Sequence, residues 1–262
     1  TIPAGPGHSG RAAIRIVRQT GSLSKMSRNR APATFGRKTI LRGVLLPGGN
    51  MSAQRQVLDN IRVSGHEIGV HGFDHARWHN AGARFSWKEA RCQVERAFND
   101  LDWLEPVSFA APGWQASFRS LAMEDRLPIR YASDTRGATP FFPVVNGYQF
   151  RTPQIPTTLP TLDELEDGFP VSRKNREEVM SLAAEQEIAV YTAHAEMEGR
   201  GMLDILDGLY ELALRENAEI LPLGEILKRV SHIPRCVLNN RLIDGRPGTV
   251  ATQGEILVSD KK

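Results

Sequence analysis

The sequence has few cysteines and no long apolar run, and both shortages exclude classes of protein. Two cysteines cannot form the disulfide framework of a small secreted domain, and they fit a reducing compartment. The longest apolar stretch, residues 188–193, has the length of a strand, whereas a bilayer-spanning helix needs ~18 apolar residues. We therefore predict no membrane-spanning helix.

Acidic residues are absent from residues 1–58, where basic residues are frequent. Ten positive charges lie in this basic segment: Arg11, Arg15, Arg18, Lys25, Arg28, Arg30, Arg37, Lys38, Arg42 and Arg55. The rest of the chain carries the other 23 of the 33 basic residues and all 30 acidic ones. A basic segment on an acidic body indicates an anionic partner such as nucleic acid, phosphate or a lipid headgroup. A solvated basic face explains the charges equally well.

The chain also lacks an initiating methionine, because it begins with Thr1, and no signal pattern precedes the fold. We interpret it as a processed or engineered product, or as a fragment. Its composition, 40% hydrophobic and 24% charged, is that of a globular protein and excludes general disorder. We predict a single domain over residues 1–262, since no linker interrupts the pattern.

Helix-like and strand-like segments alternate along most of the chain. The expected strands include residues 67–71, 107–110, 129–132 and 188–193. Such alternation predicts parallel strands covered by helices, hence an α/β fold. His71, Asp134 and His194 fall where strands end, which favours a barrel, although an open sheet also places ligands there. We expect residues 137–167 to wrap the surface and residues 235–262 to form an irregular tail.

Residues 65–75 (GHEIGVHGFDH) hold the most informative histidines. His71 and His75 are four residues apart, so a helical turn after the strand would place both rings on one face, as two ligands of a divalent metal. The spacing from His66-Glu67 does not match the metalloprotease motif His-Glu-x-x-His. Taken alone, however, the spacing favours a coincidental surface pair.

This stretch resembles the metal motif of the NodB-homology polysaccharide deacetylases, also called carbohydrate esterase family four. Four further segments resemble the branch that deformylates 4-deoxy-4-formamido-arabinose phosphoundecaprenol. They are FAAPGW at 109–114, YASDTRG at 131–137, QIPTTLPT at 154–161 and YTAHAEMEG at 191–199. Because several separate motifs agree in matching order from about Gly5 to the late helices, the resemblance is specific.

The resemblance implies a deformed (β/α) barrel in which a metal-bound water attacks an amide carbonyl. His71 and His75 correspond to metal ligands, and His194 to the histidine that protonates the departing amine. The metal is a divalent cation, with zinc, manganese, cobalt and nickel left open because imidazole accepts all four. Without the resemblance, His194 would be interpreted as a partly buried histidine at a strand end.

Three more residues are candidates for binding the sugar or its phosphate. An aromatic face such as Trp114 stacks on a pyranose, and a guanidinium such as that of Arg136 forks onto phosphate. Asp134 belongs to the same motif as Arg136. The alternatives are core packing for Trp114 and a local Asp134–Arg136 ion pair that fixes a turn. Glu196 and Glu198 are interpreted either as partners of the site or as surface residues.

The implied substrate is a sugar linked to undecaprenyl phosphate, in lipid A modification and resistance to cationic peptides. A peripheral position on the cytoplasmic side of the bacterial inner membrane follows, with the basic segment on anionic headgroups at about 1 kcal/mol per Lys or Arg. Nucleic acid is then not an expected partner. The alternatives are an N-deacetylase acting on a polysaccharide, and a non-catalytic anion-binding protein that uses residues 11–42.

The chain departs from the family at one motif. An early strand of the family ends in two aspartates, a general base and the third metal ligand, whereas the first acidic residue here is Asp59 in an expected helix. The family's arginine in the 109–114 motif is Ala110. We therefore expect a barrel without its first strand–helix unit, weak metal binding and little activity, with both recovered when the segment is restored. A fragment and a decayed copy explain this equally well.

Overall fold

The computed structural model describes residues 1–5, 49–161, 164, 173–195, 198–199, 202–243 and 248–257. Most of the basic segment and Glu196 lie outside this part. The helices are α5 (Arg55–Val63), α6 (His75–Ala81), α7 (Trp87–Leu101), α8 (Phe118–Glu124), α9 (Arg173–Ala184), α10 (Leu203–Arg215) and α11 (Leu223–Arg229), with short 3-10 turns η1 (Met51–Ala53), η2 (Gly82–Arg84), η3 (Asp102–Leu104) and η4 (Pro112–Trp114). The strands are β1 (Gly69–Val70), β2 (Ser108–Phe109), β3 (Tyr131–Ala132), β4 (Phe142–Val145), β5 (Tyr148–Gln149), β6 (Arg235–Leu242) and β7 (Thr249–Ile256).

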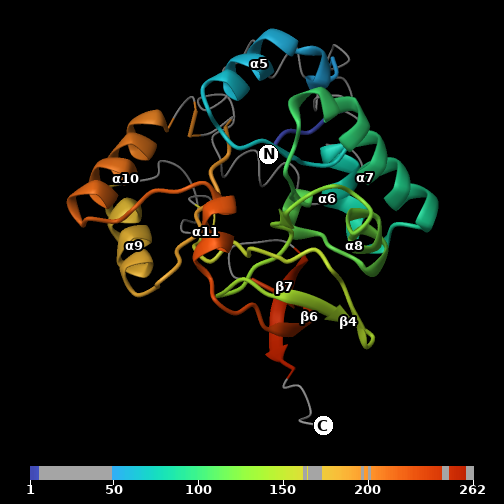
Figure 1. Cartoon of the computed structure of the whole chain (residues 1–262). Coiled ribbons are helices and arrows are strands. Elements are labelled where there is room, and N and C mark those ends of the chain that lie inside the picture. Colours follow the sequence, from blue (N-terminus) through green and yellow to red (C-terminus); the bar gives the residue numbers. More distant parts are fainter. Residues whose placement is uncertain are drawn as a thin grey trace.

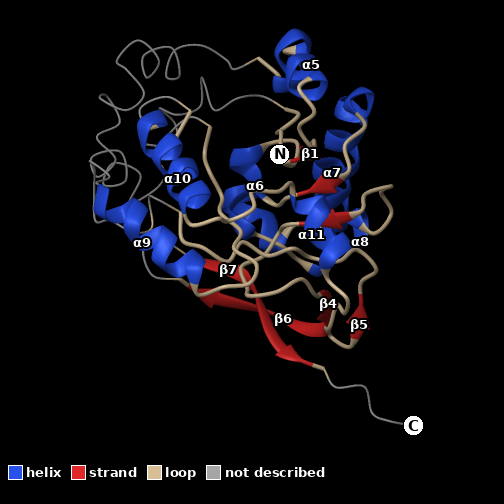
Figure 2. Ribbon diagram, turned by 60° about the vertical axis from the view of Figure 1, so that its left-hand side comes forward, coloured by secondary structure: helices blue, strands red, loops and turns tan. Residues whose placement is uncertain are grey.

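The centre of the fold is an arc of extended segments that follow one another in chain order. Strands β1, β2 and β3 pair in parallel. Parallel bridges add one segment on each side, joining Ile2 to Val70 and Ala132 to Gln154. The N-terminus accordingly lies beside β1 (Figure 2). This order confirms the predicted α/β class with parallel strands, and it is the order in which a (β/α) barrel is built.

Helices α6, α7 and α8 lie on the same side of the molecule (Figure 1), and α7 packs against α8 and β1. Helix α7 begins with a capping box, in which the side chains of Ser86 and Glu89 bond to each other's backbone. Its buried positions Ala90, Val94, Ala97 and Leu101 recur at helical spacing and join the main core. Burial of this stripe fixes α7 against the strands that carry the site.

The prediction of an irregular tail from residue 235 is wrong. Strands β6 and β7 form an antiparallel pair in a second sheet of order β5-β4-β6-β7 (Figure 2). The sequence lacks a clean alternation there because β6 is mostly half-buried or exposed, so pairing with β4 and β7 specifies it instead. Strand β7 also pairs with the segment that follows β3, where the Arg136 amide donates to Ala251 O (2.9 Å) and the Gln253 amide donates to Arg136 O (2.8 Å).

Two other expectations from the sequence are also wrong. Residues 137–167 do not simply wrap the surface: the hairpin β4–β5 is followed by buried Phe150, Ile155 and Leu159. Residues 188–193 are extended but form no strand, because the Thr158 and Leu159 amides both donate to the single carbonyl of Val190 and no ladder follows. For residues 137–167, the Pro- and Thr-rich composition indicated a surface loop, whereas part of this segment enters the core.

Candidate active site

The rings of His71 and His75 lie together at the carboxyl end of β1, with centroids 5.1 Å apart. A tight turn brings them together, and not a shared helical face, because α6 begins only at His75. Gly72 has φ +69°, and a Cβ there would lie 2.8 Å from the Trp78 ring. Only glycine fits such a position without strain. The Asp74 side chain caps α6 by accepting from the Arg77 amide.

His71 is held in one orientation by the strand next to it. Its Nδ1 lies 2.7 Å from Ala110 O, and since a carbonyl only accepts, Nδ1 carries the proton and Nε2 is the nitrogen able to bind a metal. Burial lowers the pKa of His71 well below its ordinary value, and the neighbouring His75 and, more weakly, His194 lower it further. The imidazole is therefore neutral at pH 7, the state that a metal ligand requires.

His194 lies near enough to His71 for its charge to contribute weakly to the lowered pKa of His71. Its backbone is fixed by Glu198, which is buried: one carboxylate oxygen accepts from the His194 amide (2.8 Å) and the other from the Tyr191 hydroxyl (2.8 Å). Glu198 is thus a structural partner of the loop that carries His194. The sequence left its role open.

His79 lies beside His75, although no motif in the sequence singled it out. Its ring stacks near that of His75, with centroids 6.4 Å apart, and it also lies against Gly113. Gly113 has φ +64°, and a Cβ there would lie 2.6 Å from the His79 ring. The spacing of His75 and His79, again four residues but now on one helix, was the available signal.

Asp134 is buried and faces the backbone, not Arg136. Its Oδ1 accepts from the Ala111 amide (2.6 Å), and its Oδ2 accepts from Gln154 Nε2 (2.8 Å). Gln154 returns a bond by accepting from the Asp134 amide (2.9 Å). Asp134 therefore lies behind the strand ends that carry the histidines, and the local Asp134–Arg136 ion pair does not form.

Trp114 and Arg136 pack against each other, with the guanidinium carbon 4.9 Å from the ring centroid. Arg136 Nη1 lies 2.9 Å from both carboxylate oxygens of Glu164, and Nη2 donates to Leu159 O (3.0 Å). Trp114 is buried and its Nε1 donates to Thr157 Oγ1 (3.1 Å). Both side chains are thus engaged within the protein, and their binding of substrate stays a prediction.

A divalent cation would find two protein ligands here, His71 and His75. Within the described ranges, no cluster of three or more His, Cys, Asp or Glu side chains is placed to hold a metal. The segment beside β1 runs Thr1, Ile2, Pro3, Ala4, Gly5 and so brings no carboxylate to the pair. The described residues therefore fit a metal as a two-imidazole site with its other positions open.

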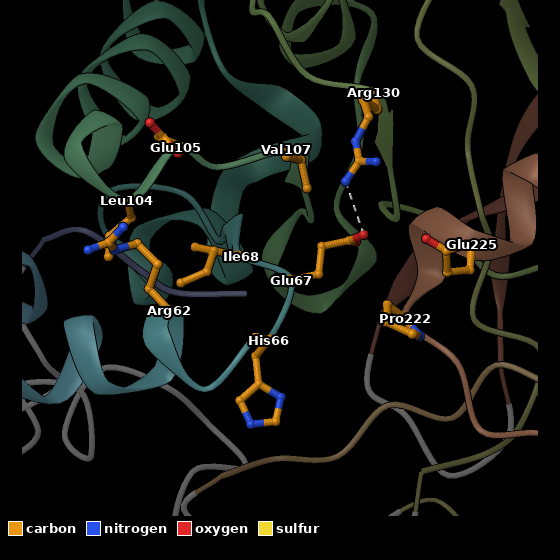
Figure 3. Close-up of a pocket in the computed structure, with 11 residues that line it drawn as sticks. Arg62, His66, Glu67, Ile68, Leu104, Glu105, Val107, Arg130, Pro222 and Glu225 are labelled. Carbon is orange, nitrogen blue, oxygen red and sulfur yellow. Dashed lines mark hydrogen bonds and ion pairs between the residues drawn. The ribbon is translucent and has the colours of Figure 1, made fainter.

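A cavity of about 300 Å³ lies at the opposite end of the strands. It is lined by His66, Glu67 and Arg130, among others, which precede β1 and β3 (Figure 3). Glu67 accepts from Arg130 Nη2 (3.2 Å) and from the Tyr131 hydroxyl. Because barrel chemistry gathers at the carboxyl ends of strands and the amino ends serve stability, we assign the site to the histidines.

Comparison with known proteins shows which family the chain belongs to. No family model matches the chain. A protein of Shewanella sediminis (strain HAW-EB3) is 31% identical over 264 residues, which cover 98% of this chain and 85% of that protein. A protein of Wigglesworthia glossinidia brevipalpis is 29% identical over 259 residues, covering 97% and 90%. Both carry the name "Probable 4-deoxy-4-formamido-L-arabinose-phosphoundecaprenol deformylase ArnD".

The fold has solved counterparts. A crystal structure assigned as a candidate polysaccharide deacetylase of Mycobacterium smegmatis superposes with a TM-score of 0.55 at 16% identity, covering 92% of this chain and all of that one. This likeness shows the fold, a deformed barrel of parallel strands and helices. Sequence and fold agree in placing the chain among amide hydrolases of the NodB type, and the chain belongs to the ArnD deformylase family.

Proposed function

We propose that this protein is a metal-dependent hydrolase that removes the formyl group from a 4-formamido-arabinose carried on undecaprenyl phosphate, in lipid A modification and resistance to cationic peptides. The observation that carries the proposal is the pairing of the His71 and His75 rings at the carboxyl end of β1, with His194 near enough for its charge to lower the pKa of His71. The names of the two relatives supply the substrate class.

The three histidines have two roles in this proposal. His71 and His75 would hold a divalent cation, which when bound lowers the pKa of water and polarises an amide carbonyl. His71 stays neutral and presents Nε2, because its Nδ1–H is held by Ala110 O. His194 delivers a proton to the departing amine, a task for which imidazole suits pH 7. With two imidazoles and no carboxylate among the described ligands, we expect a low rate for the 262-residue chain.

The first prediction concerns the acyl group. With Zn²⁺, Mn²⁺, Co²⁺ or Ni²⁺ added in turn, the chain should release formate from a short-chain polyprenyl-phosphate 4-formamido-arabinose. We expect the acetamido counterpart to react at least about tenfold more slowly, since one added methyl group changes binding by ~1–3 kcal/mol in a fitted pocket. Formate and acetate are quantified by enzymatic assay. Faster release of acetate, or activity on chitin oligosaccharides, would instead establish the alternative N-deacetylase.

The lipid carrier requires contact with a membrane surface, which we propose to be the cytoplasmic face of the inner membrane. None of the helices in the described part combines the length and the apolar character needed to cross a bilayer. Trp87 and Tyr148 are 50% and 51% exposed, and both rings pack edge-on against Phe118. Arg119 lies 5.9 Å from the Trp87 ring. Half-exposed aromatic rings beside a cation suit the anionic headgroup region of a bilayer.

The double substitution Trp87→Ala/Tyr148→Ala should lower partitioning onto phosphatidylglycerol-containing vesicles roughly 30-fold, if each ring gains ~1 kcal/mol at the interface. Co-sedimentation measures this partitioning. Tyr210→Ala is the matched control, since Tyr210 is similarly exposed on α10. Trp87 is the exposed one of the four tryptophans, so its fluorescence should shift to shorter wavelength on binding. Unchanged partitioning of the double variant would remove this surface from the proposal.

A further inference from the structure

Three polar side chains form a buried cluster behind the histidines: Glu124, Asp134 and Gln154. They come from the end of α8, from the loop after β3 and from the segment bridged to Ala132. Burying a carboxylate is costly unless it is hydrogen-bonded, so a cluster of this kind needs a physical reason. Pairing with a metal does not supply that reason, because Asp134 is turned toward the backbone at Ala111.

The contacts of the cluster converge on one peptide group. The amide of Ala111 donates to Asp134 Oδ1 at 2.6 Å, and the carbonyl of Ala110 accepts from His71 Nδ1 at 2.7 Å. The Ala110 carbonyl and the Ala111 amide belong to the same planar peptide unit. A carboxylate bonded to the amide side polarises that unit and makes its carbonyl a stronger acceptor. Asp134 and His71 are thus connected through two short bonds and one rigid plane.

The charge of this cluster resides on Asp134. Burial raises the pKa of Glu124 well above its ordinary value, and the adjacent Asp134 raises it further. The buried carboxyl group of Glu124 lies beside that of Asp134, which its protonated form can stabilise by a hydrogen bond, so an ionised Glu124 would be a buried charge beside a second carboxylate. Burial raises the pKa of Asp134 too, whereas its hydrogen-bond donors oppose that shift. Glu124 is therefore the neutral acid, and Gln154 and Ala111 stabilise the carboxylate of Asp134.

We propose that Asp134, supported by Gln154 and Glu124, is a positioning residue that orients His71 through the peptide group between Ala110 and Ala111. Metal-bound histidines commonly donate their second N–H to a carboxylate or a carbonyl, which fixes the ring and raises its basicity. Here the carbonyl is itself backed by a carboxylate, so Asp134 acts without touching the imidazole. The link to metal binding rests on the proposed function, whereas the orientation of His71 does not.

The test compares the Asp134→Asn variant with the parent chain, both labelled with ¹⁵N-histidine. In the metal-free chain, NMR should show His71 as the Nδ1–H tautomer, and Asp134→Asn should reduce the population of that tautomer. Affinity for Co²⁺ alone, followed by absorbance, should fall about 10-fold, the lower end of what loss of an outer partner costs. The tautomer is measured without metal. If only the proposed function is wrong, Asp134→Asn still changes the His71 tautomer. If the positioning role is wrong, the tautomer stays the same.

Two further variants are controls. Asp125→Asn controls for a general loss of folding stability, and Glu124→Gln tests whether Glu124 acts as a neutral side chain. Asp125→Asn removes a carboxylate that also accepts from backbone amides, those of Arg151 and Thr152, but not beside His71. It should destabilise the fold and leave the His71 tautomer unchanged. Glu124→Gln keeps a neutral side chain of the same size and should preserve the tautomer. If Asp134→Asn does not fold, Gln154→Met tests the same link by removing one donor.

The proposal is overturned if a cooperatively folding Asp134→Asn or Gln154→Met variant keeps both the His71 tautomer and the Co²⁺ affinity of the parent chain. It is also overturned if Glu124→Gln shifts the tautomer as strongly as Asp134→Asn, since Glu124 would then carry the charge. A loss of tautomer order in Asp125→Asn would show a general structural effect and no specific link.

Discussion

Replacement of His71 by alanine should lower the affinity of the chain for Co²⁺ by more than about 100-fold, beyond what loss of an outer partner costs. His71 is one of two imidazoles whose centroids lie 5.1 Å apart, so the variant leaves a single ligand. The fold should persist, because the substitution leaves only Ala110 O without its donor, at roughly 1–3 kcal/mol. Absorbance titration with Co²⁺ measures the affinity, and thermal unfolding measures stability.

The matched control is His66→Ala. His66 is exposed and lines the cavity at the other end of the strands, so its removal should leave Co²⁺ affinity unchanged. Equal losses in both variants would show that Co²⁺ binds nonspecifically to histidines. If His71→Ala retains the affinity, the proposed metal site is wrong.

A strongly salt-dependent binding of anionic vesicles that survives His71→Ala, with no hydrolysis by the parent chain, would favour the non-catalytic anion-binding alternative.

The second large effect is expected from His194→Gln. A positioned general acid contributes roughly 10²–10⁴-fold, so kcat for formate release should fall by that factor while KM changes little. Glutamine occupies a similar volume but cannot deliver the proton to the departing amine. Backbone bonds between His194 and Glu198 do not involve the imidazole, so the loop should keep its conformation. Steady-state kinetics of the amide substrate give the two parameters separately.

A substrate with a better leaving group shows whether His194 delivers a proton or only helps to bind the substrate. An aryl formate ester expels a phenolate that needs no proton at neutral pH, so His194→Gln should slow its hydrolysis much less than that of the amide. His232→Gln is the control, since His232 is exposed on the loop before β6. Equal losses on ester and amide would assign His194 to binding or structure instead.

The fold class could be predicted from the sequence because its signals are local, and the proximity of His71 and His75 also follows from local spacing. Strand–helix alternation, the Ser86–Glu89 capping box and the spacing of His71 and His75 all lie within a few residues, where chain geometry constrains the outcome. Even so, the way in which the two rings meet depends on Gly72 and its positive φ, which spacing alone does not reveal. Spacing alone favoured a coincidental surface pair, the resemblance to the family singled out the two histidines, and neither indicated the turn.

Partners that are distant along the chain were not predictable. Gln154 is 20 residues from Asp134, and Glu164 is 28 residues from Arg136, so only the tertiary fold determines that they meet. Glu124 reads as an ordinary helix-end residue until burial beside Asp134 is known. Strands β6 and β7 likewise depend on each other and on β4 and not on their own pattern. Contacts between residues far apart along the chain cannot be recognised in a single sequence.

The backbone bonds between Arg136 and strand β7 also have a consequence for biosynthesis. Ala251 and Gln253 contact Arg136 although they are translated more than a hundred positions later. At about 5–20 residues per second, the nascent chain waits roughly 6–23 s between making Arg136 and making the strand that contacts it. During that interval the emerging protein has His71 and His75 but not the strand that contacts Arg136, and we expect it to depend on chaperones until β7 is released.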